Sequence, residues 1–185
     1  MSTEQLEKFQ EIVEIPTGVK VTLKKHMVHF EGPLGKTYKN FRNIPVTIEI
    51  VDGKIILKAQ AYRKRDYSIL HTARSIVRNI CEGLIVGYTI KMKIVFAHFP
   101  ITVKVQDKTV LIENFQGERS ARVTRIIGDT KVIPKGEDVI LTGAVWNDIT
   151  QTAANIELRS KVKDKDHRVF LDGIYAYEKK KGINK

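Results

Sequence analysis

The chain has 185 residues, which is room for one large domain or two small ones, and its 42% hydrophobic and 29% charged residues are typical of a folded protein. Lys and Arg outnumber Asp and Glu by 32 to 21, and the net charge of +11 favours a polyanionic partner, either nucleic acid or an acidic membrane. One cysteine excludes an internal disulfide, and no segment approaches the roughly 18 consecutive apolar residues of a membrane span.

Residues 1–14 are acidic and amphipathic, without the basic end and apolar run of a secretion signal. Together with the lone cysteine, this start favours a reducing, cytoplasmic location. Stretches rich in Val and Ile then predict five strands, followed by a helix with an apolar stripe and a sixth strand. We expect the strands at 18–24, 27–31, 36–40, 46–51, 54–58 and 88–96, and the helix at 66–82 with Gly83 as its stop.

The second half repeats this order at a shift of about 80 residues, which indicates an internal duplication. Val21–Gly35 aligns with Val103–Gly117 without a gap. Strands are expected at 102–106, 109–113, 119–124, 138–142 and 170–177, with a helix at 148–159 capped by Asp148. The predicted fold is α+β, with two tandem similar domains at 1–98 and 99–185. Each would be a mostly antiparallel sheet packed on one α-helix.

Basic residues gather near the end of the chain. Arg159–Lys185 holds nine basic side chains against four acidic ones. One basic group lies between the last predicted helix and strand, a second follows the strand, and Tyr175 and Tyr177 stand between them, where a ring could stack on an unpaired base. A solvated loop with a frayed tail is the alternative. The weaker cluster Arg63–Arg65 is equally compatible with a solvated helix entrance and a contact site.

No set of residues predicts an active site, so we expect neither catalysis nor a cofactor nor a bound metal. The five histidines (His26, His29, His71, His98 and His167) are scattered. Gly32–Gly35 lacks the Lys and Ser/Thr of a phosphate-binding loop and is expected to be a turn between strands. Cys81 falls on the apolar stripe of the first helix, which predicts a buried thiol.

Several stretches resemble one family, the sixth protein of the large ribosomal subunit, numbered nine in eukaryotes, in its eukaryotic and archaeal branch. The most specific is RVFLDGIY at Arg168–Tyr175, similar to the family's C-terminal motif. Gly87–Ile101 is similar to its inter-domain stretch, Asn114–Arg119 to its second-domain hairpin, and Gly32–Gly35 to its first-domain turn. Residues 61–68 and 130–138 follow the family only weakly.

The resemblance implies a structural, non-enzymatic protein of the cytoplasmic ribosome that binds large-subunit rRNA near the sarcin-ricin loop. Neighbouring large-subunit proteins would abut it, and translational GTPases would dock nearby. The same resemblance places most RNA contacts in the C-terminal domain. In that domain the residues expected to bind RNA are Lys161, Lys163, Lys165, Arg168, Gly173, Tyr175, Lys179 and Lys180. Gly173 would let the backbone approach a phosphate, and Tyr175 would stack or donate a hydrogen bond.

Two other functions share these features. A free-standing RNA-binding regulator would have the same composition, but it would be absent from large-subunit and polysome fractions after sedimentation. A protein-interaction module would use its sheet edges to pair with another chain, with the charge serving solubility. Such a module would retain no RNA on a filter at low salt.

Overall fold

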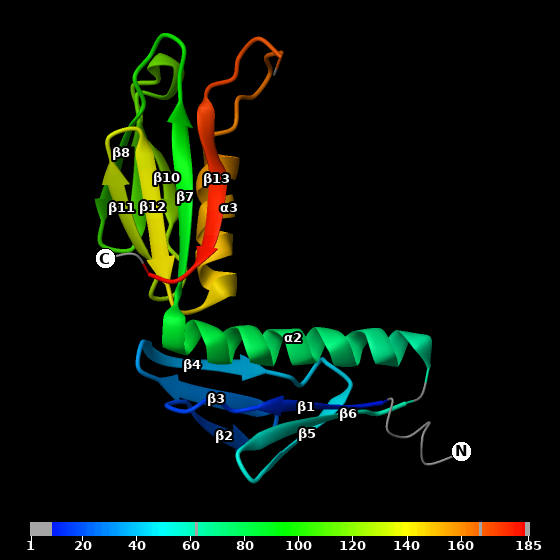
Figure 1. The fold of residues 1–185 in the computed structure, drawn as a ribbon. Coiled ribbons are helices and arrows are strands. Elements are labelled where there is room, and N and C mark those ends of the chain that lie inside the picture. The colour runs from blue at the N-terminus through cyan, green and yellow to red at the C-terminus, as the bar shows by residue number, and fades with distance from the viewer. Residues whose placement is uncertain (1–8, 62, 167, 184–185) are drawn as a thin grey trace. The chain divides into compact units, whose positions relative to one another are not determined.

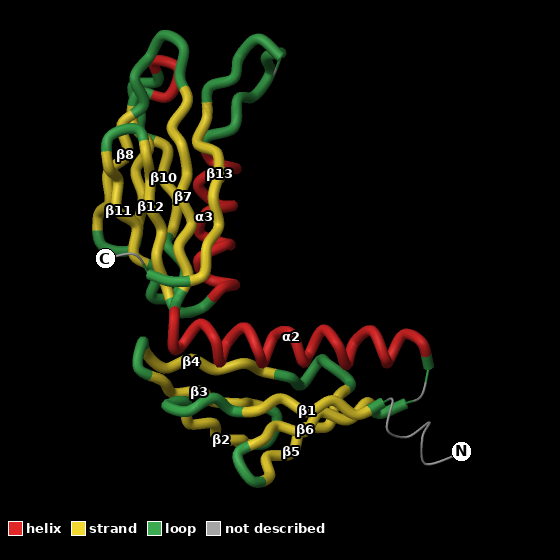
Figure 2. The backbone as a smooth tube through the Cα atoms, in the orientation of Figure 1, coloured by secondary structure: helices red, strands yellow, loops and turns green. Residues whose placement is uncertain are grey.

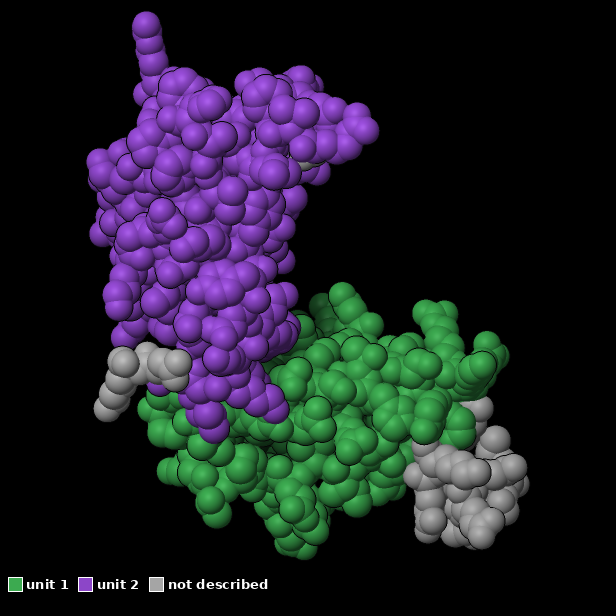
Figure 3. All heavy atoms as spheres, turned by 45° about the horizontal axis from the view of Figure 1, so that its top comes forward, with its two compact units in different colours: residues 1–85 green, residues 86–185 purple. Residues whose placement is uncertain are grey.

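The computed structural model describes residues 9–61, 63–166 and 168–183, so residues 1–8 of the amphipathic start lie outside the described residues. The chain forms two compact units, Met1–Ile85 and Val86–Lys185 (Figure 3). All of the described strand pairs are antiparallel. None of the described helices has the length and apolar character that a membrane crossing requires.

The first unit contains two three-stranded sheets and a long helix (Figures 1 and 2). One sheet has the order β1-β6-β5 and the other β2-β3-β4. The strands are β1 (Gln10–Glu14), β2 (Lys20–Lys24), β3 (Met27–Gly32), β4 (Gly35–Asn40), β5 (Val46–Val51) and β6 (Lys54–Ala59), and the helix is α2 (Lys64–Val86).

Alternating and helical periodicity build the core of this unit. Val28 and Phe30 on β3 and Ile55 and Leu57 on β6 point inward and are fully or almost fully buried. The helix meets them with an apolar stripe at spacings of three and four residues, namely Leu70, Ala73, Val77, Ile80, Cys81 and Leu84. Burial of these side chains from both sheets and the helix is the main favourable term in folding of the unit.

The predicted stop of the helix at Gly83 is wrong. Gly83 is buried within α2, which continues to Val86, and Gly87 follows with a φ of 72°. A left-handed residue just after the last helical turn is the usual glycine stop. Gly83 instead lies on the packed face of the helix, one residue before Leu84, whose carbonyl accepts a hydrogen bond from the Leu34 N–H at 3.1 Å.

The second unit combines a three-stranded sheet, β10-β9-β8, with a four-stranded sheet, β11-β12-β7-β13. Its elements are β7 (Tyr88–Val95), β8 (Thr102–Gln106), β9 (Thr109–Glu113), β10 (Arg122–Arg125), β11 (Lys131–Lys135), β12 (Asp138–Gly143), α3 (Trp146–Arg159) and β13 (Gly173–Lys181). One apolar cluster joins both sheets to α3, with Ile90, Ile112, Phe115, Leu141 and Ile156 completely buried.

The α+β class and the antiparallel pairing are confirmed, and the arrangement is consistent with a duplication. The expectation of one sheet per half is wrong, because each unit has two. β7, predicted to end the first half, pairs with β12 and β13 of the second unit. In the sequence, the boundary between the two compact units lies between residues 85 and 86. The predicted domain boundary at 98/99 stays a prediction. Asp148 lies in the first turn of α3, where the N-cap is Val145.

Candidate nucleic-acid interface

The basic residues predicted to bind RNA lie mainly on the segment that joins α3 to β13 (Figure 1). We call residues 160–172 the basic loop; His167 within it lies outside the described residues. The described cations of the loop are Lys161, Lys163, Lys165 and Arg168, and all of them are exposed. The two ends of the loop are attached to the folded unit by hydrogen bonds.

Arg122 on β10 holds the helix end of the basic loop. Its Nη1 donates to the carbonyl oxygens of Arg159 at 2.9 Å and Lys161 at 3.0 Å. Nε and Nη2 donate to the Glu118 carboxylate at 2.8 and 2.6 Å, and the guanidinium lies 4.0 Å from the centre of the Phe115 ring. The hydrogen bond from Arg122 also lowers the pKa of Glu118. A rigid, multiply bonded guanidinium thus fixes where the loop begins.

Two buried polar side chains hold the strand end. The Ser160 hydroxyl accepts a hydrogen bond from the Ile174 N–H at 3.0 Å and donates to the Glu157 carbonyl at 3.1 Å. The Asp172 carboxylate accepts from the Ala97 N–H at 3.0 Å. Burial raises the cost of leaving either group unpaired, so these bonds define the loop's exit as well as its start.

Gly173 and Tyr175 form a packed pair at the start of β13. A Cβ on Gly173 would lie 2.7 Å from Cζ and Oη of Tyr175, so the ring covers the glycine. The Tyr175 hydroxyl donates to the carbonyls of Leu171 at 3.3 Å and Asp172 at 3.4 Å. Burial, together with Glu157 and Asp172, raises the pKa of Tyr175, so the hydroxyl stays protonated. Gly173 is buried, and the side chain packed against it is this ring.

The cations of the basic loop differ in their partners. Arg168 forms a two-pronged ion pair with Asp166, with Nη2 donating to Oδ2 at 2.9 Å and Nε to Oδ1 at 3.1 Å. Lys165 lies 4.8 Å from the centre of the Phe170 ring. Among the described residues, no carboxylate pairs with Lys161 or Lys163. These two lysines are therefore the ones most readily available to a phosphate.

Lys179 and Lys180 lie within β13, because the strand runs to Lys181 and does not end at Tyr177 as predicted. Lys180 pairs with Glu178 at 2.5 Å, and Lys91 of β7 pairs with the same carboxylate at 2.8 Å. The two lysines lower the pKa of Glu178. The second basic group therefore lies in the last residues of β13, where Glu178 neutralises part of its charge.

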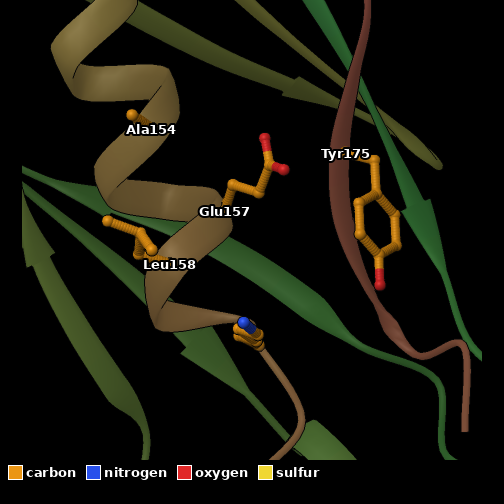
Figure 4. Close-up of a pocket in the computed structure, with 5 residues that line it drawn as sticks. Ala154, Glu157, Leu158 and Tyr175 are labelled. Atoms are coloured by element: carbon orange, nitrogen blue, oxygen red, sulfur yellow. The ribbon is translucent and has the colours of Figure 1, made fainter. Parts of the chain in front are cut away.

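Two hollows flank the end of α3. The larger, of about 520 Å³, is lined by Ala154, Glu157, Leu158, Lys161 and Tyr175, with the helix on one side and β13 on the other (Figure 4). The smaller, of about 300 Å³, is lined by Ala121, Arg122, Val123, Leu158, Arg159 and Lys163. Leu158, 66% exposed, belongs to both hollows, and each hollow carries a lysine of the basic loop.

The predicted binding residues other than Gly173 therefore form four groups. Lys161 and Tyr175 share the larger hollow, Lys163 lines the smaller one, Lys165 and Arg168 lie farther along the basic loop, and Lys179 and Lys180 lie on β13. Arg122 and Ser160 were missed. A single Arg in a strand and a single Ser after a helix have no distinctive spacing, so only the folded chain shows what they hold.

Chemistry of other kinds has little support in the described part of the chain. No group of three or more His, Cys, Asp or Glu there has an arrangement that could hold a metal ion. Cys81 is buried, as predicted, and burial raises the pKa of its thiol to about 11. A thiol with so high a pKa is a poor nucleophile at neutral pH. Arg63–Arg65 is exposed where α2 begins.

Comparison with known proteins gives many similar sequences, although no family model matches the chain. The protein named large ribosomal subunit protein uL6 in Methanosphaera stadtmanae is 44% identical over 177 residues, covering 95% of this chain and 96% of the relative. The protein of that name in Staphylothermus marinus is 42% identical over 178 residues, with 94% and 96% covered. In Methanosarcina mazei the corresponding values are 40%, 167 residues, 90% and 95%.

Proposed function

The chain belongs to the uL6 family of large ribosomal subunit proteins, in its archaeal branch, and from this premise we propose that it is a structural protein of that subunit whose basic loop binds rRNA. It acts by position and catalyses no reaction. The rRNA bound is the region of the sarcin-ricin loop, beside which translational GTPases dock, and neighbouring large-subunit proteins complete its surroundings.

One observation carries the proposal: the basic loop is fixed at both ends and leaves its cations exposed. Arg122 fixes the helix end, and Ser160 and Asp172 fix the strand end. A pre-positioned loop loses less conformational entropy when it binds than a free tail does. This arrangement favours recognition of a folded RNA over a general attraction to polyanions.

The chemistry at each part of the loop follows from its partners. Lys161 and Lys163 place ammonium groups beside the two hollows, where phosphates would displace their counterions. Arg168 keeps N–H donors beyond those engaged by Asp166, and these match a phosphate in a fork geometry. Tyr175 is 41% exposed, which suits contact with a ribose or a base.

The test is a charge-matched pair of variants binding an rRNA transcript that contains the sarcin-ricin loop. In the loop variant Lys161, Lys163, Lys165 and Arg168 are replaced with Ala. In the control variant the exposed lysines elsewhere in the same unit, Lys104, Lys108, Lys131 and Lys135, are replaced with Ala. Both variants lose four positive charges, so any difference between them reports position and not net charge.

We expect the loop variant to bind at least tenfold more weakly than the control variant. The slope of log affinity against log salt concentration should fall by up to about 3 in the loop variant, since each phosphate contact contributes nearly one unit. An equal loss in both variants would reduce the interaction to general charge attraction. Unchanged affinity of the loop variant would show that the assigned surface is wrong.

A further inference from the structure

The solvent face of the sheet β2-β3-β4 carries a row of side chains with two aromatic rings. Strand register aligns Thr22 with His29 and His29 with Tyr38, one residue from each strand. Tyr38 is 63% exposed and His29 is partly exposed, with their ring centres 6.0 Å apart and their planes inclined at 38°. The opposite face carries Val28 and Phe30 into the core, so the aromatic row is held on a rigid support.

Lysines border this aromatic row on both sides. Two residues along the strands in one direction is the row Lys20, Glu31 and Lys36. Two residues in the other direction, Lys24 aligns with Met27. Lys36 pairs with Glu31 at 2.8 Å, and Lys36 and, more weakly, Lys20 lower the pKa of Glu31. Three lysines thus face one carboxylate, so the face has a positive charge that complements a polyanion.

The corresponding face of the second unit lacks both rings. The duplication aligns β2 and β3 with β8 and β9, and the strands pair in the same register, with Lys20 opposite Glu31 and Thr102 opposite Glu113. The row that matches Thr22, His29 and Tyr38 is Lys104, Leu111 and Val123. The aromatic row is therefore specific to the first unit and does not follow from the architecture that the two units share.

We propose that this sheet face of the first unit binds unpaired nucleotides of RNA, with Tyr38 and His29 stacking on bases and Lys20 and Lys24 contacting the backbone. Exposed rings on a sheet framed by lysines suit single strands, since the bases of a duplex are already stacked and paired. The site is separate from the basic loop, in sequence and in compact unit, and it gives the protein a second kind of RNA contact.

The experiment removes the stronger platform in a protein that already lacks the loop cations. Tyr38→Ala, Tyr38→Phe and the matched control Val123→Ala are each added to the loop variant. Val123 is 44% exposed and occupies the position equivalent to Tyr38. Binding of a labelled ten-nucleotide uridine oligomer, single-stranded or annealed to its complement, is measured at low salt, and thermal unfolding checks that each variant is folded.

We expect Tyr38→Ala to weaken binding of the single strand by about tenfold, within the range of roughly 5- to 150-fold that one stacked base supports. Tyr38→Phe and Val123→Ala should stay within about twofold of the parent, because stacking needs the ring and not the hydroxyl. Affinity for the duplex should be the same in all three.

Equal single-strand affinity of Tyr38→Ala and Val123→Ala would overturn the assignment. So would a Tyr38→Ala protein that keeps its RNA affinity but no longer enters the large subunit, because that result would assign the face to a protein neighbour. The oligomer measurements use the loop variant as their common background, so the first outcome does not depend on whether the basic loop binds rRNA. The second outcome is tested with Tyr38→Ala in a chain that keeps its loop cations.

Discussion

The ends of the two helices separate the two copies of the duplicated sequence most clearly. In the first unit α2 is followed by Gly87 alone before β7 begins, whereas in the second unit the basic loop intervenes between α3 and β13. The residue that holds this loop, Arg122, also has no arginine counterpart in the first unit. Arg122 pairs with Ile112, which is equivalent to Phe30 in the duplication, and the residue that pairs with Phe30 is Thr37. The shared architecture thus supplies packing, while the residues that we propose to contact RNA belong to one copy or the other.

The largest expected effect separates the cores of the two units. Phe30 and Ile112 are equivalent in the duplication and almost completely buried. Phe30→Ala should lower the free energy of unfolding of the first unit by about 3 to 5 kcal/mol, through lost burial and a residual cavity. Amide hydrogen exchange should accelerate in residues 9–85 and stay slow in the core of the second unit. Ile112→Ala should give the reverse pattern; a single transition shared by both units would contradict separate cores.

The next effect concerns Arg122, whose equivalent in the first unit is Thr37. Arg122→Ala should lower the free energy of unfolding by about 2 kcal/mol, because charged hydrogen bonds to two carbonyls and one carboxylate are lost. Its rRNA affinity should fall as well, although the loop cations remain. Arg122→Lys should not recover either property, since one ammonium group does not reproduce a fork of donors. Thr37→Ala at the equivalent position should leave rRNA affinity unchanged.

A smaller effect tests the packed pair at the start of β13. Gly173→Ala should cost about 1 kcal/mol, because the Tyr175 ring must move and give up its hydrogen bonds to Leu171 and Asp172. In a Tyr175→Ala background the same change should cost nothing measurable in chemical denaturation. An equal cost in both backgrounds would show that the glycine serves some contact other than the ring.

The smallest effect is a pH dependence in the first turn of α3. Burial, and to a lesser degree Asp129, raises the pKa of Asp148, so the folded chain binds this proton more tightly than the unfolded chain. The resulting stability is present below the unfolded value near 3.8 and is lost as pH rises through the raised folded value. Asp148→Asn should remove this loss, so the variant's stability relative to the parent should increase across that acidic window in urea titrations. A constant difference would contradict the shift.

Elements with strong local patterns were predictable from the sequence. The β2-β3 and β8-β9 hairpins and both helices follow from alternation, turns and apolar stripes. β1 was missed because its partner, β6, lies about 40 residues away in sequence, so no local hairpin pattern reveals the pairing. β11 was missed because it contains Pro134, and a proline argues against a strand. The structure tolerates it because β11 is an edge strand of its sheet.

The candidate site was only partly predictable for the same reason. Lys161, Lys163, Lys165 and Arg168 stand out as a cluster of charge in the sequence. The residues that hold the loop in place do not stand out in the sequence, because Arg122 reaches the loop from β10 and Ser160 accepts a hydrogen bond from β13. The aromatic row on β2-β3-β4 depends on strand register, which places His29 beside Tyr38, and neither residue stands out in the sequence alone.

A cryo-EM map of a large ribosomal subunit that contains this chain tests the central claim most directly. We expect the map to show the basic loop against rRNA, with Lys161, Lys163 and Arg168 within hydrogen-bonding distance of phosphates close to the sarcin-ricin loop. A map in which residues 161–172 face solvent, while another surface of the second unit holds the protein to the subunit, would contradict that claim.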